Sequence, residues 1–432
     1  MNKKIVTFDV GTNFDDEILE FIKANDKDNR IKTLYGKVKD DKLSGGRSPM
    51  MESGFSLEDI GGYVAKCKEA GIEFNYLINP MCMGQRETDP DTAFELRKII
   101  HNIYDMGVRQ FTVNSPILAK YFKDTFKDVW VTLGLYAYPT TLQQVNLWVN
   151  WGVDEITLDH SFNRNFPLLE KLLTMYKDSG VSFRLIANNL CVKDCILRLS
   201  HGNFVSHSSN QGMVMDYCLA NCTRTKVENP SLFISSDWIR PEDVHYYEEL
   251  CEKTGNHNFS IKLVDRTKSN DFIKRVITAY LNESYDGNLL DIVNWNERRK
   301  MTDMKGRMPF KGAEKMNPDM MRLYGRVMCN PEIMIDNKKL DGFIEHFLKG
   351  SNCSEKMCDT VALNCGSGCM ENCGYCNAWA KKAISYNQAE VNDWLESVRK
   401  LAWLLETGEF AGNPGAHQFA RADMKMNPNM PV

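Results

Sequence analysis

Short apolar, β-branched segments alternate with longer segments of helical periodicity from the N-terminus to about residue 280. Such alternation is typical of repeated βα units, in which helices cover a parallel sheet. We expect strands at 4–8, 33–36, 73–79, 109–114, 129–135, 155–159, 182–188 and 259–264. Eight units predict an α/β fold, a closed (β/α)8 barrel of the TIM type, with a doubly wound open sheet as the alternative.

Helix boundary signals support this division of the chain. The segment 57–70 follows Ser56, a good N-cap residue, and ends before Gly71. A second long helix is expected at 389–407, where apolar residues fall on one face and Gly408 follows.

The alternation stops near residue 284. We therefore expect a barrel domain over 1–283, a polar connecting segment over 284–350, and a cysteine-rich, mostly helical extension over 351–432.

Composition restricts the function classes. The chain has 432 residues with a formal net charge of -4, so overall charge does not favour nucleic acid or anionic lipid, although a local basic groove stays open. No run of about 18 apolar residues occurs, and the N-terminus lacks the apolar core of a signal peptide. We expect a cytoplasmic protein without membrane association.

Cysteine is unusually frequent, with fourteen residues. Thiols stay reduced in the cytosol, so clustered cysteines there indicate a metal site rather than disulfides. Ten of the fourteen fall into two groups, Cys191, Cys195, Cys218 and Cys222, then Cys353, Cys358, Cys365, Cys369, Cys373 and Cys376. Two metal centres are the simplest explanation.

The first group consists of two Cys-x3-Cys pairs, the first of which directly follows the expected strand 182–188. Four thiolates supplied as two pairs can hold a 4Fe-4S cluster, and a structural zinc site has the same ligand count. In a barrel the active site lies at the C-terminal ends of the strands, where this chain has polar side chains. The candidates from these strand ends are Asn79, Asn188 and Arg266.

The sequence resembles the peptidase U32 family over roughly 1–285. The resemblance includes the paired cysteines after the seventh strand, the stretch Ser235–Asp243, and the stretch Ile261–Arg266 followed by Lys268-Ser269 and Val276–Tyr280. Better understood members of that family are iron-sulfur barrels that hydroxylate quinone precursors or RNA bases without molecular oxygen. The resemblance implies that Cys191, Cys195, Cys218 and Cys222 bind the cluster.

The chain departs from the family pattern at its first cysteine pair, whose gap is three residues where other members have a longer, glycine-containing one. Just behind the pair lie Arg198, His201 and His207. An arginine here could hold a substrate carboxylate, and a histidine near a redox centre could move protons. The three are candidate catalytic residues, with hydrogen-bonded loop histidines as the alternative.

The second group packs Cys365, Cys369, Cys373 and Cys376 into one short, glycine-containing loop. Gaps of three, three and two residues are closer to ferredoxin spacing than to zinc sites. The last three also resemble the motif of radical S-adenosylmethionine enzymes, in which the fourth iron binds the cofactor. The nearby Cys365 favours a closed four-thiolate cage instead.

These observations predict an iron-sulfur redox enzyme with one or two 4Fe-4S clusters. The expected reaction is oxygen-independent hydroxylation, or a related oxidation or reduction, of a small aromatic or carboxylate-bearing metabolite. S-adenosylmethionine chemistry is one alternative, and an electron-transfer or scaffold subunit of a two-barrel complex is another. No nucleophile or zincin motif supports a peptidase. The expected partners are a small-molecule substrate and a second barrel subunit or electron donor.

Overall fold

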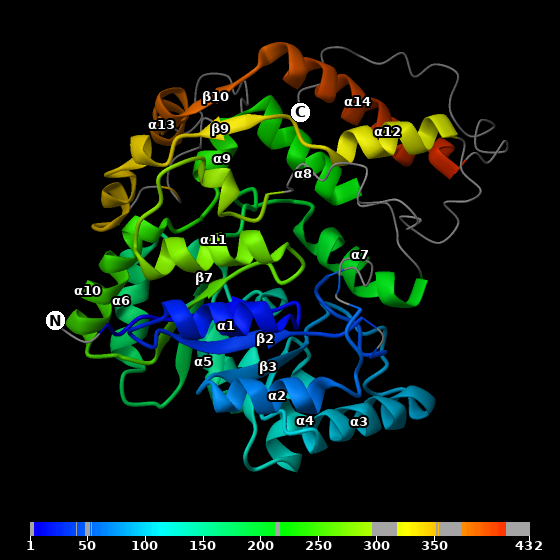
Figure 1. Cartoon of the computed structure of the whole chain (residues 1–432), viewed down its shortest axis with the longest axis vertical. Helices are drawn as coiled ribbons and strands as arrows, with labels where there is room; N and C mark the ends of the chain where they lie inside the picture. Colours follow the sequence, from blue (N-terminus) through cyan, green and yellow to red (C-terminus); the bar gives the residue numbers. More distant parts are fainter. Residues whose placement is uncertain are drawn as a thin grey trace.

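The computed structural model describes residues 4–39, 41–47, 52, 54–211, 217–295, 318–350, 353 and 373–411. Eight parallel strands close into a barrel in which each strand pairs with the next in sequence and the eighth pairs with the first (Figure 1). The predicted (β/α)8 barrel is confirmed. The strands are β1 (Thr7–Gly11), β2 (Ile31–Gly36), β3 (Glu73–Ile78), β4 (Gln110–Val113), β5 (Trp130–Leu133), β6 (Glu155–Thr157), β7 (Ser182–Ile186) and β8 (Phe259–Leu263).

The first strand begins later than the sequence predicts, at Thr7 instead of residue 4. The backbone N–H groups of Ile5 and Val6 donate to the Glu248 carboxylate, at 2.7 and 3.2 Å. Because a side chain on the helix before β8 satisfies these donors, the two residues do not join the ladder.

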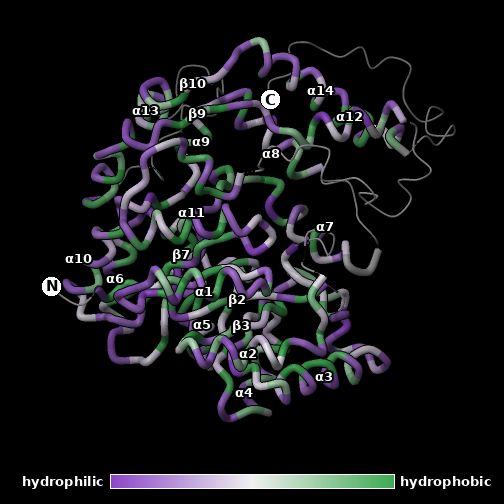
Figure 2. The backbone as a smooth tube through the Cα atoms, in the orientation of Figure 1, coloured by the Kyte–Doolittle hydropathy of each residue, from purple (hydrophilic) through white to green (hydrophobic). Residues whose placement is uncertain are grey.

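Helices surround the barrel, and hydrophobic and hydrophilic residues alternate along helices such as α3 (Figure 2). The segment expected at 57–70 becomes helical only at Ile60, because the Ser56 hydroxyl accepts from the nearby backbone N–H of Glu58 instead of capping the helix. The surrounding helices are α1 (Asp16–Asn25), α2 (Ile60–Glu69), α3 (Pro90–Asp105), α4 (Pro116–Thr125), α5 (Leu142–Trp151), α6 (Phe166–Met175), α10 (Val244–Thr254) and α11 (Asn270–Leu281).

The barrel interior has a polar layer and an apolar layer. In the polar layer, the Arg184 guanidinium lies 3.0 Å from carboxylate oxygens of both Asp9 and Glu155, and it is 1% exposed. An apolar cluster of Tyr35, Leu77, Ile186 and Val264 lies at the C-terminal ends of the strands. Opposite charges inside the barrel therefore compensate one another beneath an apolar layer.

Three additional helices lie between β7 and α10, the helix that precedes β8. They are α7 (Arg198–Gln211), α8 (Tyr217–Glu228) and α9 (Ser231–Ser235). The C-terminal extension covers them, since α14 packs on α8 and α13 packs on α9 (Figure 1). The helices and strands of the connecting segment include α12 (Pro318–Met328) and β9 (Ile333–Ile335), and those of the extension include α13 (Tyr375–Ala383), β10 (Ile384–Tyr386) and α14 (Gln388–Glu406). The helix expected at 389–407 is thus present as α14.

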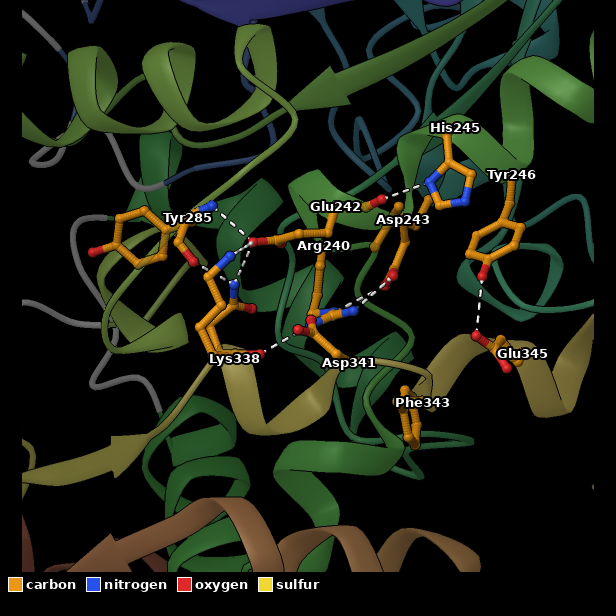
Figure 3. A network of polar contacts seen from close by, with 12 residues as sticks. Arg240, Glu242, Asp243, His245, Tyr246, Tyr285, Lys338, Asp341, Phe343 and Glu345 are labelled. Carbon is orange, nitrogen blue, oxygen red and sulfur yellow. Dashed lines mark hydrogen bonds and ion pairs between the residues drawn. The ribbon is translucent and has the colours of Figure 1, made fainter.

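A network of charged and amide side chains fastens the connecting segment to the barrel (Figure 3). Arg240 donates to both carboxylate oxygens of Asp243, at 3.0 and 2.8 Å, and to Asp341 at 2.8 Å. Glu242 accepts from the backbone N–H of Tyr285 and from the Asn337 amide, at 2.8 and 2.9 Å. Part of the stretch Ser235–Asp243 therefore serves to dock the connecting segment.

No helix in the described ranges has the length and apolar character that crossing a bilayer requires.

Candidate functional site

The four cysteines of the first group line one cavity of about 60 Å³ at the C-terminal end of the barrel. Cys191 and Cys195 lie on the loop that leaves β7, and Cys218 and Cys222 lie one turn apart on α8. The i, i+4 spacing places the second pair on one helix face. The cavity is also lined by Asp159, His160, Ser161, Val192, Lys193, Asp194, Leu197, Arg198, His201 and Asp237. The two cysteine pairs that the spacing predicts therefore line the same cavity.

The four thiols line the same cavity but do not converge on one point. Among the described residues, no three Cys, His, Asp or Glu side chains are close enough to share a metal ion as they stand. The donors themselves suit a soft metal or an iron-sulfur cluster, because all four are sulfur atoms on a loop and a helix that face each other across one space.

A buried lysine stands beside the thiols. The Lys226 ammonium lies one helical turn after Cys222, 3.0 Å from its Sγ, and donates to the backbone carbonyl of Leu190 at 2.9 Å. The residue is 3% exposed, and no carboxylate pairs with it in the described part of the chain. Burying an unpaired ammonium is costly, so the site needs a negative charge that thiolates would supply.

The two loop thiols, Cys191 and Cys195, hold their protons more tightly than a free cysteine does. Burial raises the pKa of Cys191 to about 11, and the neighbouring Cys222 thiol adds to the shift, against the charge of Lys226. Burial also raises the pKa of Cys195. A nucleophilic cysteine needs the opposite shift, whereas a metal ion deprotonates its own thiol ligands.

Arg198 forms the opposite wall with Asp159 and His160. Its guanidinium pairs with the Asp159 carboxylate and lies 4.1 Å from the ring centre of Tyr138. Burial would raise the pKa of Asp159, but its hydrogen bond and ion pair with Arg198 outweigh this effect and lower it. Burial lowers the pKa of His160 to about 4, so this imidazole is neutral near pH 7.

The two candidate histidines differ in position. His201 lines the cavity beside the cysteines. His207 is not among the residues that line it, and its ring lies next to Gly84, on the loop after β3. Only His201 is thus placed next to the thiols.

The three strand-end candidates lie outside the cysteine cavity. Asn188 is 0% exposed, and its amide bonds to the backbone of Val264 and Ile292, which indicates a structural bracket. Arg266 is buried in an ion pair with Glu52. Asn79 is half-buried and accepts from the Gly46 N–H at 3.2 Å. Their contacts favour structural support of the barrel mouth.

The second cysteine group is described only in part. Cys353, Cys373 and Cys376 are half-buried, and Cys376 lies in the first turn of α13. This helix packs on α9, which leads into the cavity residue Asp237. Cys358, Cys365 and Cys369 lie outside the described residues, as do the closed cage and the three-cysteine motif that depend on them.

Sequence reasoning missed Lys226 and Tyr138. The first could have been found from its i+4 spacing after Cys222 on the same helix face. No local signal marks Tyr138, because the loop after β5 meets Arg198 only through the closure of the barrel.

The fold places the chain among (β/α)8-barrel proteins, with a cavity lined by four cysteines at its mouth. No protein-family model matches the chain. Among curated proteins, it is similar to an uncharacterized protease of Methanocaldococcus jannaschii, with 26% identity over 341 residues that cover 78% of this chain and 85% of that protein.

Solved structures show weaker likeness. A U32 peptidase has 16% identity and a TM-score of 0.44, and the match covers 61% of this chain and 95% of that one. A chitinase from Aspergillus fumigatus has 8% identity and a TM-score of 0.36, covering 60% and 90%. The fold assignment rests on the closed barrel itself and not on these scores.

Proposed function

We propose that this chain is an iron-sulfur redox enzyme that holds a 4Fe-4S cluster with Cys191, Cys195, Cys218 and Cys222. The observation that carries the proposal is the buried Lys226 ammonium, whose available counter-charge is cysteine sulfur. Zinc held by four thiolates would also supply negative charge. The likeness to U32 proteins favours iron-sulfur over zinc.

The proposed reaction is oxygen-independent hydroxylation, or a related oxidation or reduction, of a small aromatic or carboxylate-bearing metabolite. A bound cluster would supply one-electron transfer. Arg198 is positioned to hold an anionic group at the cavity wall, and His201 is positioned to accept or return a proton. A second barrel subunit, an electron donor or a cluster in the extension would exchange electrons with the site.

A peptidase is disfavoured, although the curated relative is named a protease. Burial raises the pKa of Cys191, and a thiol that stays protonated is a poor nucleophile.

The test is metal analysis of protein purified without oxygen. Iron and acid-labile sulfide in equal amounts, about eight of each per chain if both groups bind clusters, support the proposal. Stoichiometric zinc without iron would overturn it. If the same sample hydrolyses casein and the Cys191→Ser variant does not, the protein is a peptidase instead.

A further inference from the structure

The loop that leaves β5 places two tyrosines at the barrel mouth. Tyr136 and Tyr138 are half-buried, with ring centres 6.1 Å apart and planes inclined by 51°. Tyr138 has a left-handed backbone, with φ of 47° and ψ of 57°. A non-glycine residue in this region is costly and persists only where its surroundings require it, which is common at binding sites.

One end of this tyrosine pair reaches the cysteine cavity. The Arg198 guanidinium stacks on Tyr138 at 4.1 Å and lines the cavity with the four cysteines. Guanidinium has five N–H donors, and Asp159 engages the one amino group for which a bond is present. The Arg198 side chain also interacts with the Tyr138 hydroxyl and is 27% exposed, so part of the guanidinium faces the open side of the cavity.

The other end of the pair meets a second arginine. The Tyr136 ring lies against the backbone at Gly46, where an added Cβ would approach its Cε2 to 3.3 Å. The adjacent Arg47 binds Asp265 through its Nε at 2.8 Å and is 25% exposed. Tyr136 is also near enough to Arg47 for the two to interact electrostatically. We call Arg47, Tyr136, Tyr138 and Arg198 the mouth strip.

A similar triad elsewhere in the chain shows what is distinctive here. Arg109 lies 3.9 Å from the ring centre of Tyr104 and binds Asp128 at 2.8 Å. It precedes β4, at the opposite end of the barrel, and its NH1 also donates to two backbone carbonyls. These local contacts account for the position of Arg109. The mouth strip differs in that its Arg198 guanidinium lines a cavity.

We propose that the mouth strip is the substrate subsite and that it takes a planar aromatic ring bearing a carboxylate, a proposal that rests on the proposed function of the cysteine cavity. The tyrosine faces and edges pack against an aromatic ring. The Arg198 fork matches a carboxylate bidentately, which a lysine could not do. The ring would then lie between the strip and the cysteine cavity.

The test is anaerobic calorimetric titration of the purified, metal-loaded protein with three probes of similar size. Benzoate has both features, benzamide lacks the charge, and cyclohexanecarboxylate lacks the aromatic ring. We expect benzoate to bind at least about tenfold more tightly than either of the others, because each lacks one of the two interactions. Equal binding of the three probes, or no binding of benzoate, would overturn the subsite.

Variants locate the binding site. Arg198→Gln should weaken benzoate binding about ten- to hundredfold, Arg198→Lys should weaken it less, and Tyr138→Leu should weaken it about three- to tenfold. Arg109→Gln, the matched control, should leave it unchanged. Circular dichroism and iron content are recorded for each variant, so that a misfolded one is recognised. Unchanged affinity in folded Arg198→Gln and Tyr138→Leu would overturn the proposal.

The measurements distinguish a failure of the proposed cluster from a failure of the proposed subsite. A protein without iron that still binds benzoate through Arg198 would overturn the proposed cluster and leave the subsite standing. A protein with iron and sulfide that ignores benzoate would overturn the subsite alone.

Discussion

Two buried lysines at the barrel mouth have opposite surroundings. Lys37, after β2, is 5% exposed and pairs with the Asp41 carboxylate, which also accepts from the Tyr76 hydroxyl at 2.6 Å. Lys226, on α8, is 3% exposed, and in the described part of the chain it bonds to a cysteine sulfur and a carbonyl oxygen, at 3.0 and 2.9 Å. The positive charge of Lys37 is compensated by the Asp41 carboxylate. Within the described residues no carboxylate pairs with the second lysine, so ionised thiols are the counter-charge that we propose for it, in a site that binds a metal.

The largest expected effect is the loss of one metal centre. Cys222→Ser should lose about four irons per chain, because a 4Fe-4S cluster held by four thiolates is destabilised when one ligand is removed. Iron and sulfide analysis of the anaerobic protein measures this change. Cys329→Ser, the control, changes a half-buried cysteine outside the cavity and should keep all of its iron. Equal iron content in Cys222→Ser and Cys329→Ser would contradict a cluster beside Lys226, and with it the proposed difference between the two lysines.

The second prediction exchanges the two lysines for a neutral side chain. Lys37→Met should lower the free energy of unfolding by about 3–5 kcal/mol, because it leaves the buried Asp41 carboxylate without its partner. Urea unfolding followed by circular dichroism measures this loss, and iron content should stay the same.

Lys226→Met should act on the metal centre instead. Removing a positive charge next to a ligand sulfur disfavours the reduced state, so the reduction potential should fall by on the order of 50–100 mV. Potentiometric titration followed by electron paramagnetic resonance gives this value. An unchanged potential in Lys226→Met, or a shift of the same size in Lys37→Met, would show that the two lysines do not differ as proposed.

The third prediction compares two strand-end asparagines. Asn188→Ala should lower the free energy of unfolding by about 3 kcal/mol, because the buried polar groups of Val264 and Ile292 lose their partner. Asn79→Ala should lower it by about 1 kcal/mol, since the Asn79 side chain is half-buried and accepts a 3.2 Å hydrogen bond from the Gly46 N–H. Urea unfolding of both variants measures the difference. A larger loss for Asn79→Ala would contradict the bracket role of Asn188.

The smallest expected effect is a dependence on pH. Burial would raise the pKa of Asp265, but the charges of Arg47, Arg266 and Lys268 hold it well below its ordinary value. A carboxyl whose pKa is lowered by folding stabilises the fold above about pH 4 and loses this contribution as the pH falls.

The stability difference between the unmodified protein and Asp265→Asn should therefore narrow by about 1 kcal/mol between pH 6 and pH 3. Urea unfolding at the two pH values measures it. A difference that stays constant or widens toward pH 3 would contradict the ion pairs assigned to Asp265.

The sequence was sufficient for the barrel and for one of its two cysteine groups. Strand positions follow from apolar periodicity, and Cys191, Cys195, Cys218 and Cys222 could be paired because each pair occupies one loop or one helix face. The start of β1 could not be placed, because Glu248, far along the chain, takes the donors of Ile5 and Val6.

Residue roles were harder to predict than positions. The rule that barrel strand ends face the ligand predicts a location but not the direction of a side chain, and the Asn188 amide bonds to the backbone of Val264 and Ile292. Tyr138 joins the site through a contact with Arg198 sixty residues away, for which the sequence has no local pattern.

The most direct test of the account isolates the first cysteine group. A variant with Cys365, Cys369, Cys373 and Cys376 all changed to serine is purified without oxygen, and its iron, sulfide and zinc are measured before and after Lys226→Met is added. The account predicts about four irons and four sulfides per chain, with a reducible centre whose potential falls on removal of Lys226. Zinc in place of iron, or no bound metal in a folded protein, would contradict it.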